Sequence, residues 1–187
     1  MHKFNPEHIG RLLRADRLGD STPEQMLRSL GLKEGDTFAD VGCGPGFFTI
    51  PAALITGPAG TVYAIDTQQE MLDSLLERKP PANVVPVRSG EHSIPVPGSS
   101  ADMALAAYVL HEAQDKRLFL EEVRRIIRKG GTIAVIDWKK QVEEHGPPVE
   151  DRVTEGAASG LVKEAGFTGV KTSSLNDSHY LVTAVKA

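Results

Sequence analysis

The sequence contains one cysteine, Cys43, and no long apolar run among its 187 residues. A single cysteine cannot form an internal disulfide, and nothing else points to an oxidising compartment. No apolar stretch approaches the roughly 18–20 residues that a membrane-spanning helix requires. The N-terminal segment 1–9 is polar and lacks the apolar stretch of a secretory signal. We therefore expect a cytoplasmic protein with no membrane partner.

Positive charge and metal-binding patterns are also scarce. The chain has 21 Lys and Arg residues against 25 Asp and Glu residues, which gives a net charge of -4. A nucleic-acid surface normally needs a basic patch, so we expect no nucleic-acid partner. Cysteine and histidine do not cluster at the spacing of a metal site, so we expect no metal ion.

The pattern that is present is that of a single α/β domain. Short β-branched runs alternate with amphipathic stretches of helical length, and the runs are nearly continuous in apolar character, as in a sheet covered on both faces. This alternation predicts parallel strands joined by right-handed crossovers, and hence a doubly wound sheet. The predicted strands span residues 37–41, 61–66, 84–88, 103–108 and 132–138.

Helices are predicted between these strands. One helix should bury the face formed by Met71, Leu72, Leu75 and Leu76. A second helix, which contains Val123, should carry Arg128 and Lys129 in its last turns and stop at Gly130. Basic residues and glycine both favour a helix C-terminus.

The C-terminal part follows a different pattern. Residues 154–165 are typical of a helix, and two β-rich runs follow at 170–174 and 180–185. The link between these runs is short and turn-like, so they should pair antiparallel. The sequence therefore predicts a parallel sheet that ends in an antiparallel hairpin, which is not the usual ending of a dehydrogenase.

A glycine-rich loop after the first predicted strand is the most informative segment, and it reads Asp40-Val41-Gly42-Cys43-Gly44-Pro45-Gly46-Phe47. The third glycine comes one residue earlier than in the dinucleotide motif G-x-G-x-x-G, and Phe47 stands at the motif's last glycine. The Asp40 carboxylate would repel a pyrophosphate but suits a cationic amino or sulfonium group. Asp66 closes the next strand, where a carboxylate accepts hydrogen bonds from ribose hydroxyls.

Segment 38–46 resembles motif I of the class I S-adenosylmethionine-dependent methyltransferases, and Asp66 lies where that family keeps its ribose acid. Residues 102–112 are similar to the family's fourth strand and following loop, and residues 165–167 to the segment before its closing hairpin. The resemblance implies a seven-stranded, mostly parallel sheet with an antiparallel C-terminal hairpin, helices on both faces, and S-adenosylmethionine as the cofactor. The N-terminal thirty residues also look like those of small stand-alone bacterial members.

The resemblance further implies roles in cofactor binding. The three loop glycines should line the methionine part, Asp40 should hold the amino group, and Asp66 should bind the ribose. The loop after the third strand departs from the family pattern, since Gly90 stands near the usual aspartate; the residue at the adenine amino group therefore stays open. The implied cofactor-binding residues are Asp40, Gly42, Cys43, Gly44, Gly46, Asp66, Thr67, Gln68, Gly90, Glu91, His92 and Ala106.

His111 and Tyr108 are the candidate catalytic residues, because they follow the fourth strand at the edge where open α/β sheets bind ligands. Histidine titrates in the range of a base near neutral pH, and a base is needed if the acceptor is an alcohol, a phenol or a protonated amine. The alternative interpretation is that His111 packs at the loop-to-helix junction and that Tyr108 covers the end of the sheet.

The acceptor side is small. Residues 1–30 form a predicted helical cap with apolar positions such as Leu12 and Leu18 and basic positions such as Arg14 and Arg17; residues 31–187 form the methyltransferase domain. Only the loop 141–152 follows the fifth strand, which favours a small-molecule acceptor. The accepting atom and the oligomeric state stay open. Two alternatives remain, a nicotinamide oxidoreductase and a non-catalytic module that binds S-adenosylmethionine.

Overall fold

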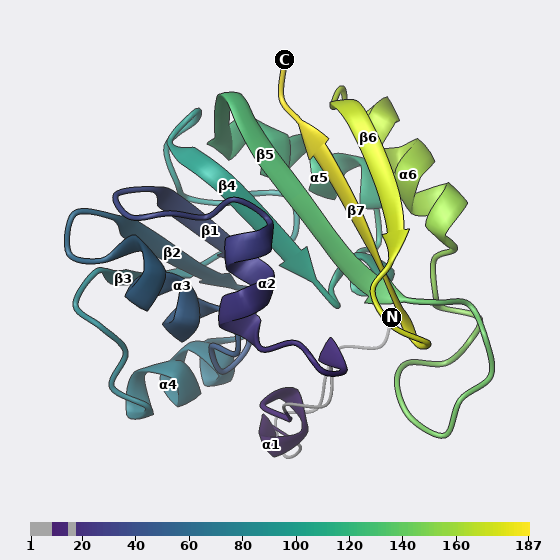
Figure 1. Ribbon diagram of the computed structural model, residues 1–187, viewed down its shortest axis with the longest axis horizontal. Coiled ribbons are helices and arrows are strands. Elements are labelled where there is room, and N and C mark those ends of the chain that lie inside the picture. The colour runs from purple at the N-terminus through teal and green to yellow at the C-terminus, as the bar shows by residue number, and fades with distance from the viewer. Residues whose placement is uncertain (1–8, 15–17) are drawn as a thin grey trace.

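A seven-stranded sheet in the order β3-β2-β1-β4-β5-β7-β6 forms the centre of the computed structural model, which describes residues 9–14 and 18–187 (Figure 1). Strands β1 to β5 run parallel, and β7 is antiparallel to both β5 and β6. The doubly wound sheet and its antiparallel closing hairpin are therefore confirmed. The strands are β1 (Thr37–Val41), β2 (Thr61–Asp66), β3 (Val84–Arg88), β4 (Ala101–Ala107), β5 (Ile127–Trp138), β6 (Thr168–Ser174) and β7 (His179–Val185).

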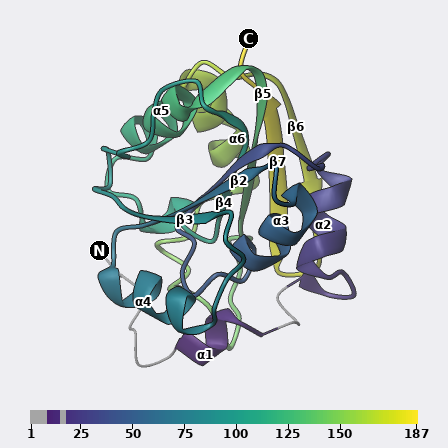
Figure 2. The ribbon, with the colours of Figure 1, turned by 90° about the vertical axis from the view of Figure 1, so that its left-hand side faces the viewer.

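Helices cover both faces of this sheet. Helices α2 and α3 lie on one face and α5 and α6 on the other, as the side view in Figure 2 shows. Each face has its own apolar cluster, one around Phe38, Val62 and Leu105, the other around Ile65, Ala104 and Val135. The helices are α1 (Ile9–Leu12), α2 (Pro23–Ser29), α3 (Thr49–Thr56), α4 (Gln69–Glu77), the 3₁₀ turn η3 (Leu110–Glu112), α5 (Lys116–Ile126) and α6 (Glu155–Glu164).

The helix before β5 is the clearest correction to the sequence prediction. Helix α5 ends at Ile126, and Ile127 is already extended, with φ -72° and ψ 137°, and pairs with Ala101 of β4. Arg128 and Lys129 therefore belong to β5 and not to the last turns of a helix. The left-handed conformation of Gly130 falls within the strand and does not end the helix. Strand pairing with β4 therefore overrides the local sequence preference for a helix that continues to Gly130.

Two smaller predictions concern α4 and the N-terminal segment. In α4, Met71, Leu72 and Leu75 are buried as expected, but the Leu76 side chain is 48% exposed, so the buried face is narrower than predicted. In the N-terminal segment, Leu18 is buried and Arg14 is exposed, whereas residues 1–8 and Arg17 lie outside the described residues. None of the helices in the described ranges is long and apolar enough to cross a membrane.

The strand register brings the chemistry-bearing loops to one edge of the sheet. Val41 of β1 pairs with Ile65 of β2 on one side and with Ala106 of β4 on the other. The loops that follow these strands therefore leave the sheet side by side. In open α/β sheets, ligands bind beyond this carboxyl edge.

Candidate functional site

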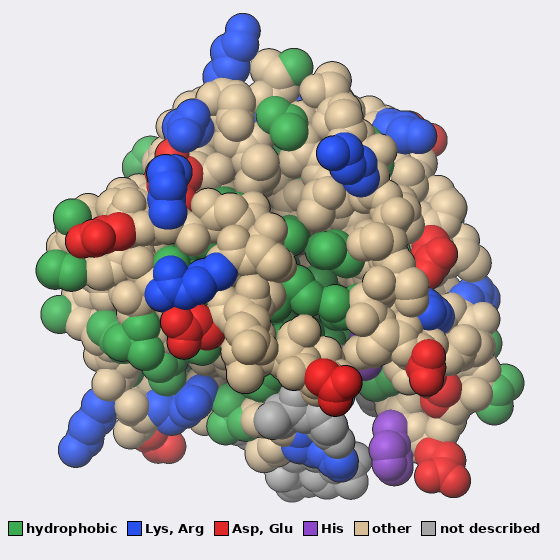
Figure 3. All heavy atoms as spheres, viewed as in Figure 1, with side chains coloured by type: hydrophobic (Ala, Val, Ile, Leu, Met, Phe, Trp, Pro, Cys, Tyr) green, Lys and Arg blue, Asp and Glu red, His purple; other side chains and the backbone are tan. Residues whose placement is uncertain are grey.

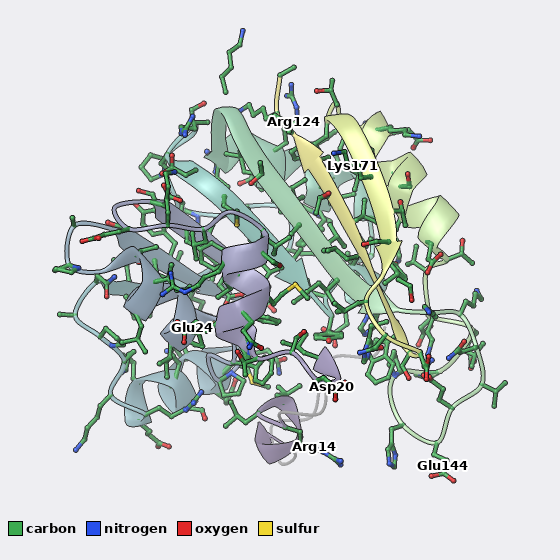
Figure 4. All side chains as sticks on the ribbon, viewed as in Figure 1. Arg14, Asp20, Glu24, Arg124, Glu144 and Lys171 are labelled. Atoms are coloured by element: carbon green, nitrogen blue, oxygen red, sulfur yellow. The ribbon has the colours of Figure 1, made fainter. Side chains whose placement is uncertain are left out.

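A cavity of about 1120 Å³ opens at the carboxyl ends of the parallel strands. Its walls come from the loops after β1, β2, β3, β4 and β5, and from the turn between β6 and β7. Helix α1 and the loop after β5 flank the opening, and Figure 4 labels one side chain near each of them, Arg14 and Glu144. The volume suits a ligand of cofactor size together with a small second molecule.

The glycine loop forms one end of the cavity. Its backbone adopts left-handed conformations, which favour glycine. Gly42 has φ +75° and Gly46 has φ +88°, a region that L-residues with side chains rarely adopt. A Cβ atom at Gly46 would lie 2.4 Å from Cδ1 of Leu75 in α4, and one at Gly42 would lie 3.0 Å from the Val109 side chain. The loop can therefore lie this close to α4 and to the loop after β4 only with glycine at these positions.

Asp66 links the glycine loop to the loop after β2. Its Oδ2 accepts a hydrogen bond from the backbone N–H of Gly44 at 2.9 Å, and its Oδ1 accepts one from the N–H of Gln68, also at 2.9 Å. The residue is only 8% exposed, yet it lines the cavity. Two backbone donors thus fix the carboxylate at the cavity wall.

Asp40 is buried beneath the glycine loop and also reaches the cavity. The hydroxyl of Thr49 donates a hydrogen bond to its Oδ2 at 2.6 Å. Burial raises the pKa of Asp40 to about 7, because the Thr49 hydrogen bond offsets only part of the desolvation and the charge of Asp66 adds to the rise. A cation bound beside Asp40 would favour its ionised form.

Cys43 lies in the same loop without the environment of a nucleophile. Burial raises the pKa of its thiol well above the usual value, and the nearby carboxylates of Asp40 and Asp66 raise it further. A thiol that stays protonated at neutral pH is a poor nucleophile. Cys43 therefore serves the turn as a small buried residue.

His111 and Asp137 form a hydrogen-bonded pair at the other end of the cavity. Nδ1 of His111 lies 2.7 Å from Oδ1 of Asp137, and the backbone N–H of His111 donates to Oδ2 at 3.0 Å. Asp137 is fully buried, and the backbone N–H of Trp138 also donates to its Oδ1. Because a carboxylate only accepts hydrogen bonds, this arrangement places a proton on Nδ1 and leaves Nε2 as the acceptor of neutral His111.

The same surroundings make the imidazole more basic. Burial would lower the pKa of His111, but the hydrogen bond and charge of Asp137, together with the charges of Glu112 and Asp151, outweigh it, so the pKa is raised. The His111 side chain is 6% exposed and lines the cavity. A buried imidazole with a carboxylate on Nδ1 is the arrangement of an oriented general base.

An aromatic cluster forms the wall next to this pair. The Tyr108 ring lies 4.9 Å from the ring of His179 and 6.0 Å from that of Trp138, centroid to centroid, and Trp138 lies 4.3 Å from His179. Tyr108 has φ +61°, which is unusual for an aromatic residue and marks a strained turn directly after β4. Strain of this kind is often kept where a side chain must be aimed at a ligand.

The structure brings most of the predicted site residues together. Eleven of them line the cavity, namely Asp40, Gly42, Cys43, Gly44, Asp66, Thr67, Gln68, Gly90, Glu91, Tyr108 and His111. Three predicted residues are not among its lining residues. Gly46 is buried within the glycine loop, and His92 is exposed. Ala106 is buried, while its neighbour Ala107 lines the cavity.

Sequence reasoning missed several residues that line the cavity. Glu143, Glu144, His145, Ser178 and His179 line the cavity from the loop after β5 and from the turn between β6 and β7. No local motif marks these positions. Only the strand order could have indicated His179, because β7 lies beside β5 and its first residue pairs with Trp138.

Comparison with known proteins agrees with this geometry. A family model described as "Methyltransferase domain" matches residues 39–135, which include the glycine loop, Asp66 and His111. The chain superposes on a crystal structure of a SAM-dependent methyltransferase from Aquifex aeolicus with a TM-score of 0.91. The two are 34% identical, and the alignment covers 99% of this chain and 100% of the other.

Two curated relatives match a shorter region. An uncharacterised 37.1 kDa protein in a transposon of Streptomyces fradiae is 34% identical over 116 residues, which is 60% of this chain and 34% of that protein. A demethylmenaquinone methyltransferase of a Geobacillus strain is 26% identical over 117 residues, or 61% of this chain and 50% of that protein. The matched region thus spans half or less of the length of these two relatives.

Proposed function

The chain belongs to the class I S-adenosylmethionine-dependent methyltransferases, and on this premise we propose that it methylates a small, uncharged, flat acceptor that carries an ionisable ring hydroxyl. The observation that carries the proposal is the His111–Asp137 pair, whose histidine lines the same cavity as the glycine loop. An oriented base is needed for such an acceptor and not for one that reacts without losing a proton.

The residues at the glycine-loop end fit the cofactor of this family. When bound, S-adenosylmethionine supplies a methyl group already activated by a sulfonium. The carboxylate of Asp40 would face the cationic amino group, and that of Asp66 would accept hydrogen bonds from the ribose hydroxyls. Thr67 and Gln68, together with the loop of Gly90, would surround the adenine.

At the other end, the chain would hold and deprotonate the acceptor. Nε2 of His111 accepts the hydroxyl proton, and the resulting imidazolium is stabilised by the buried carboxylate of Asp137. The acceptor is left as an oxyanion, whose oxygen or activated ring carbon can take the methyl group; a methylated ring carbon would then release its own proton to solvent, and the oxygen would regain one. The proton then leaves His111 to solvent, which restores the neutral base.

Two observations support the acceptor class. Glu112 and Glu144 line this end of the cavity, and Arg14 is the one Lys or Arg among the described lining residues. An anionic acceptor would therefore be repelled. The rings of Tyr108, Trp138 and His179 offer aromatic surface against which a flat ring can pack. The Geobacillus relative is named as a demethylmenaquinone methyltransferase, which points to a quinol-like ring.

Basic side chains elsewhere do not suggest a polyanionic acceptor. On the face shown in Figure 3, Lys and Arg side chains are interspersed with Asp and Glu and do not gather in one patch. The net charge of -4 has the same sign as the charge of the cavity wall.

An acceptor panel with labelled S-adenosylmethionine tests the proposal. We expect methyl transfer to a reduced naphthoquinone and to catechol, and little or none to 3,4-dihydroxybenzoate, which adds a carboxylate to the same ring. An aliphatic amine serves as the comparison without a ring hydroxyl. Transfer only to the amine, or preferentially to the benzoate, would contradict the proposed acceptor class. Cofactor binding with no transfer to any compound would favour a non-catalytic module.

A further inference from the structure

Arg152 is a buried charged residue that the reaction does not require. It follows the loop after β5 and is only 3% exposed. Its guanidinium donates to three backbone carbonyls on the near and far parts of this loop, those of Lys139, Gln141 and His145, at 3.1, 3.0 and 2.9 Å. Nε donates to the carbonyl of Pro147 at 3.0 Å.

The loop has no regular structure of its own. No helix or strand lies between Trp138 and Glu155, so its carbonyls are not satisfied by regular structure. One guanidinium presents five N–H donors in a rigid fork, and here the fork meets carbonyls that are up to eight residues apart, from Lys139 to Pro147. The loop is therefore folded around the Arg152 side chain.

The same guanidinium also contacts the aromatic wall. Its Cζ lies 4.9 Å from the ring centroid of Trp138, within the range of a cation–π contact. Gly146 completes the arrangement with φ +100°, since a Cβ atom there would lie 2.8 Å from Nη2 of Arg152 and 2.9 Å from Cζ3 of Trp138. Loop, guanidinium and indole thus pack without room for a further side chain.

Arg152 also sets the charge of the wall. Its Nη1 lies 2.6 Å from Oε2 of Glu143, which lines the cavity. Without Arg152, the Glu143 carboxylate would lose its ion-pair partner and keep the hydrogen bond from Gln141. Arg152 itself is not among the lining residues, so it acts on the cavity through Glu143, through Trp138 and through the loop backbone.

We propose that Arg152 is a positioning residue for acceptor recognition, which holds residues 143–147 and Trp138 as one wall of the acceptor end of the cavity. The inference rests on the proposed function for its acceptor, but its structural part can be measured without one. Replacing Arg152 should weaken acceptor binding and leave cofactor binding intact, because the contacts of its side chain lie within the loop and on Trp138.

Trp138 is the only tryptophan, so its fluorescence reports directly on this wall. We would measure acrylamide quenching of Trp138 and S-adenosylhomocysteine affinity by calorimetry in R152M, R152K and G146A. Lys140→Met is the matched control, because Lys140 is an exposed cation of the same loop with one weak contact, 3.4 Å to the carbonyl of Glu150. R152K and G146A keep the test available if R152M does not fold.

The proposal expects R152M and G146A to raise the quenching constant by about twofold or more, with R152K intermediate and K140M unchanged. The affinity for S-adenosylhomocysteine should stay within about twofold in all variants. With a reduced naphthoquinone, the KM of R152M for the acceptor should rise about tenfold or more, while its KM for S-adenosylmethionine holds.

Two results would overturn the inference: unchanged quenching in R152M and R152K, or a parallel loss of cofactor affinity and acceptor binding that a general structural role would produce. An acceptor KM that stays constant despite increased quenching would also refute the recognition role. If the wild-type protein methylates no acceptor while quenching behaves as expected, the proposed function fails and the positioning of the wall by Arg152 stands.

Discussion

Replacing Asp137 by asparagine removes a charge from the base pair and keeps the shape of the side chain. In the native protein, Oδ1 of Asp137 accepts from the imidazole Nδ1–H and from the backbone N–H of Trp138, and Oδ2 accepts from the backbone N–H of His111. An amide offers one acceptor atom and one donor group in these two places. Whichever way the amide is turned, at least one donor meets another donor.

The two orientations have different chemical consequences. If the amide oxygen replaces Oδ2, the NH₂ group faces Nδ1, and the imidazole must carry its proton on Nε2, where it can no longer act as a base. If the oxygen replaces Oδ1, the backbone N–H of His111 loses its acceptor. A buried unsatisfied donor costs about 1–3 kcal/mol of stability, and loss of general-base catalysis lowers turnover by about 10²–10⁴-fold.

The pH dependence provides an independent check. Neutral His111 is the active form, so wild-type turnover should rise with pH through a pKa above the ordinary value of 6.5. In D137N the hydrogen bond and charge that raise this pKa are lost, so the rising limb should move to lower pH while the plateau falls. His111 also contributes stability that is present below its unfolded pKa and lost as pH rises through its folded pKa.

The assay is single-turnover methyl transfer to a reduced naphthoquinone, combined with ¹⁵N NMR of the imidazole to determine the tautomer. Asp151→Asn is the matched control, because Asp151 is exposed and affects His111 through charge alone. D151N should keep nearly wild-type turnover. Wild-type turnover in D137N, with the proton still on Nδ1, would refute the assignment of the pair as the base.

Three further predictions concern the cofactor end. Asp66→Ala should weaken S-adenosylmethionine binding by about 1.5–3 kcal/mol, the scale of hydrogen bonds to a charged group, and unchanged affinity in calorimetry would reject the ribose assignment. Because the pKa of Asp40 is raised to about 7, cofactor affinity should increase as pH rises through about 7, and Asp40→Asn should flatten this profile. Without cofactor, the free energy of unfolding should fall as pH rises from the ordinary Asp pKa of 3.8 to about 7. Gly46→Ala, with φ +88° and a Cβ 2.4 Å from Leu75, should lower the free energy of unfolding by about 1–3 kcal/mol in denaturant titrations, whereas Gly160→Ala, with open space in α6, should not.

Local patterns predicted the fold well. The alternation of apolar runs and amphipathic stretches was enough to place β1, β2 and β3 at their observed bounds. The glycine loop and Asp66 could be recognised because each lies in a short segment with a definite spacing. The end of α5 was misplaced because pairing of Ile127 with β4 is a tertiary effect that the local sequence does not contain.

The acceptor end could be predicted only in part. His111 was identified from its place after β4, but its partner Asp137 lies 26 residues away and meets it only because β4 and β5 are neighbours. His179 reaches the wall through the pairing of β7 with β5. No motif marks Arg152, since most of its hydrogen-bond partners are backbone carbonyls of an irregular loop. The family match also sets aside the nicotinamide alternative for the glycine loop.

The central claim is that one cavity binds S-adenosylmethionine and uses His111 to activate a ring hydroxyl. Its most direct test is single-turnover transfer of a labelled methyl group to a reduced naphthoquinone by the wild-type protein and by His111→Asn. The account predicts product formation by the wild type and a rate lower by about 10²–10⁴-fold in H111N, with calorimetric affinity for S-adenosylhomocysteine nearly unchanged. Equal rates in the two proteins, or no labelled product from a wild-type protein that binds the cofactor, would contradict it.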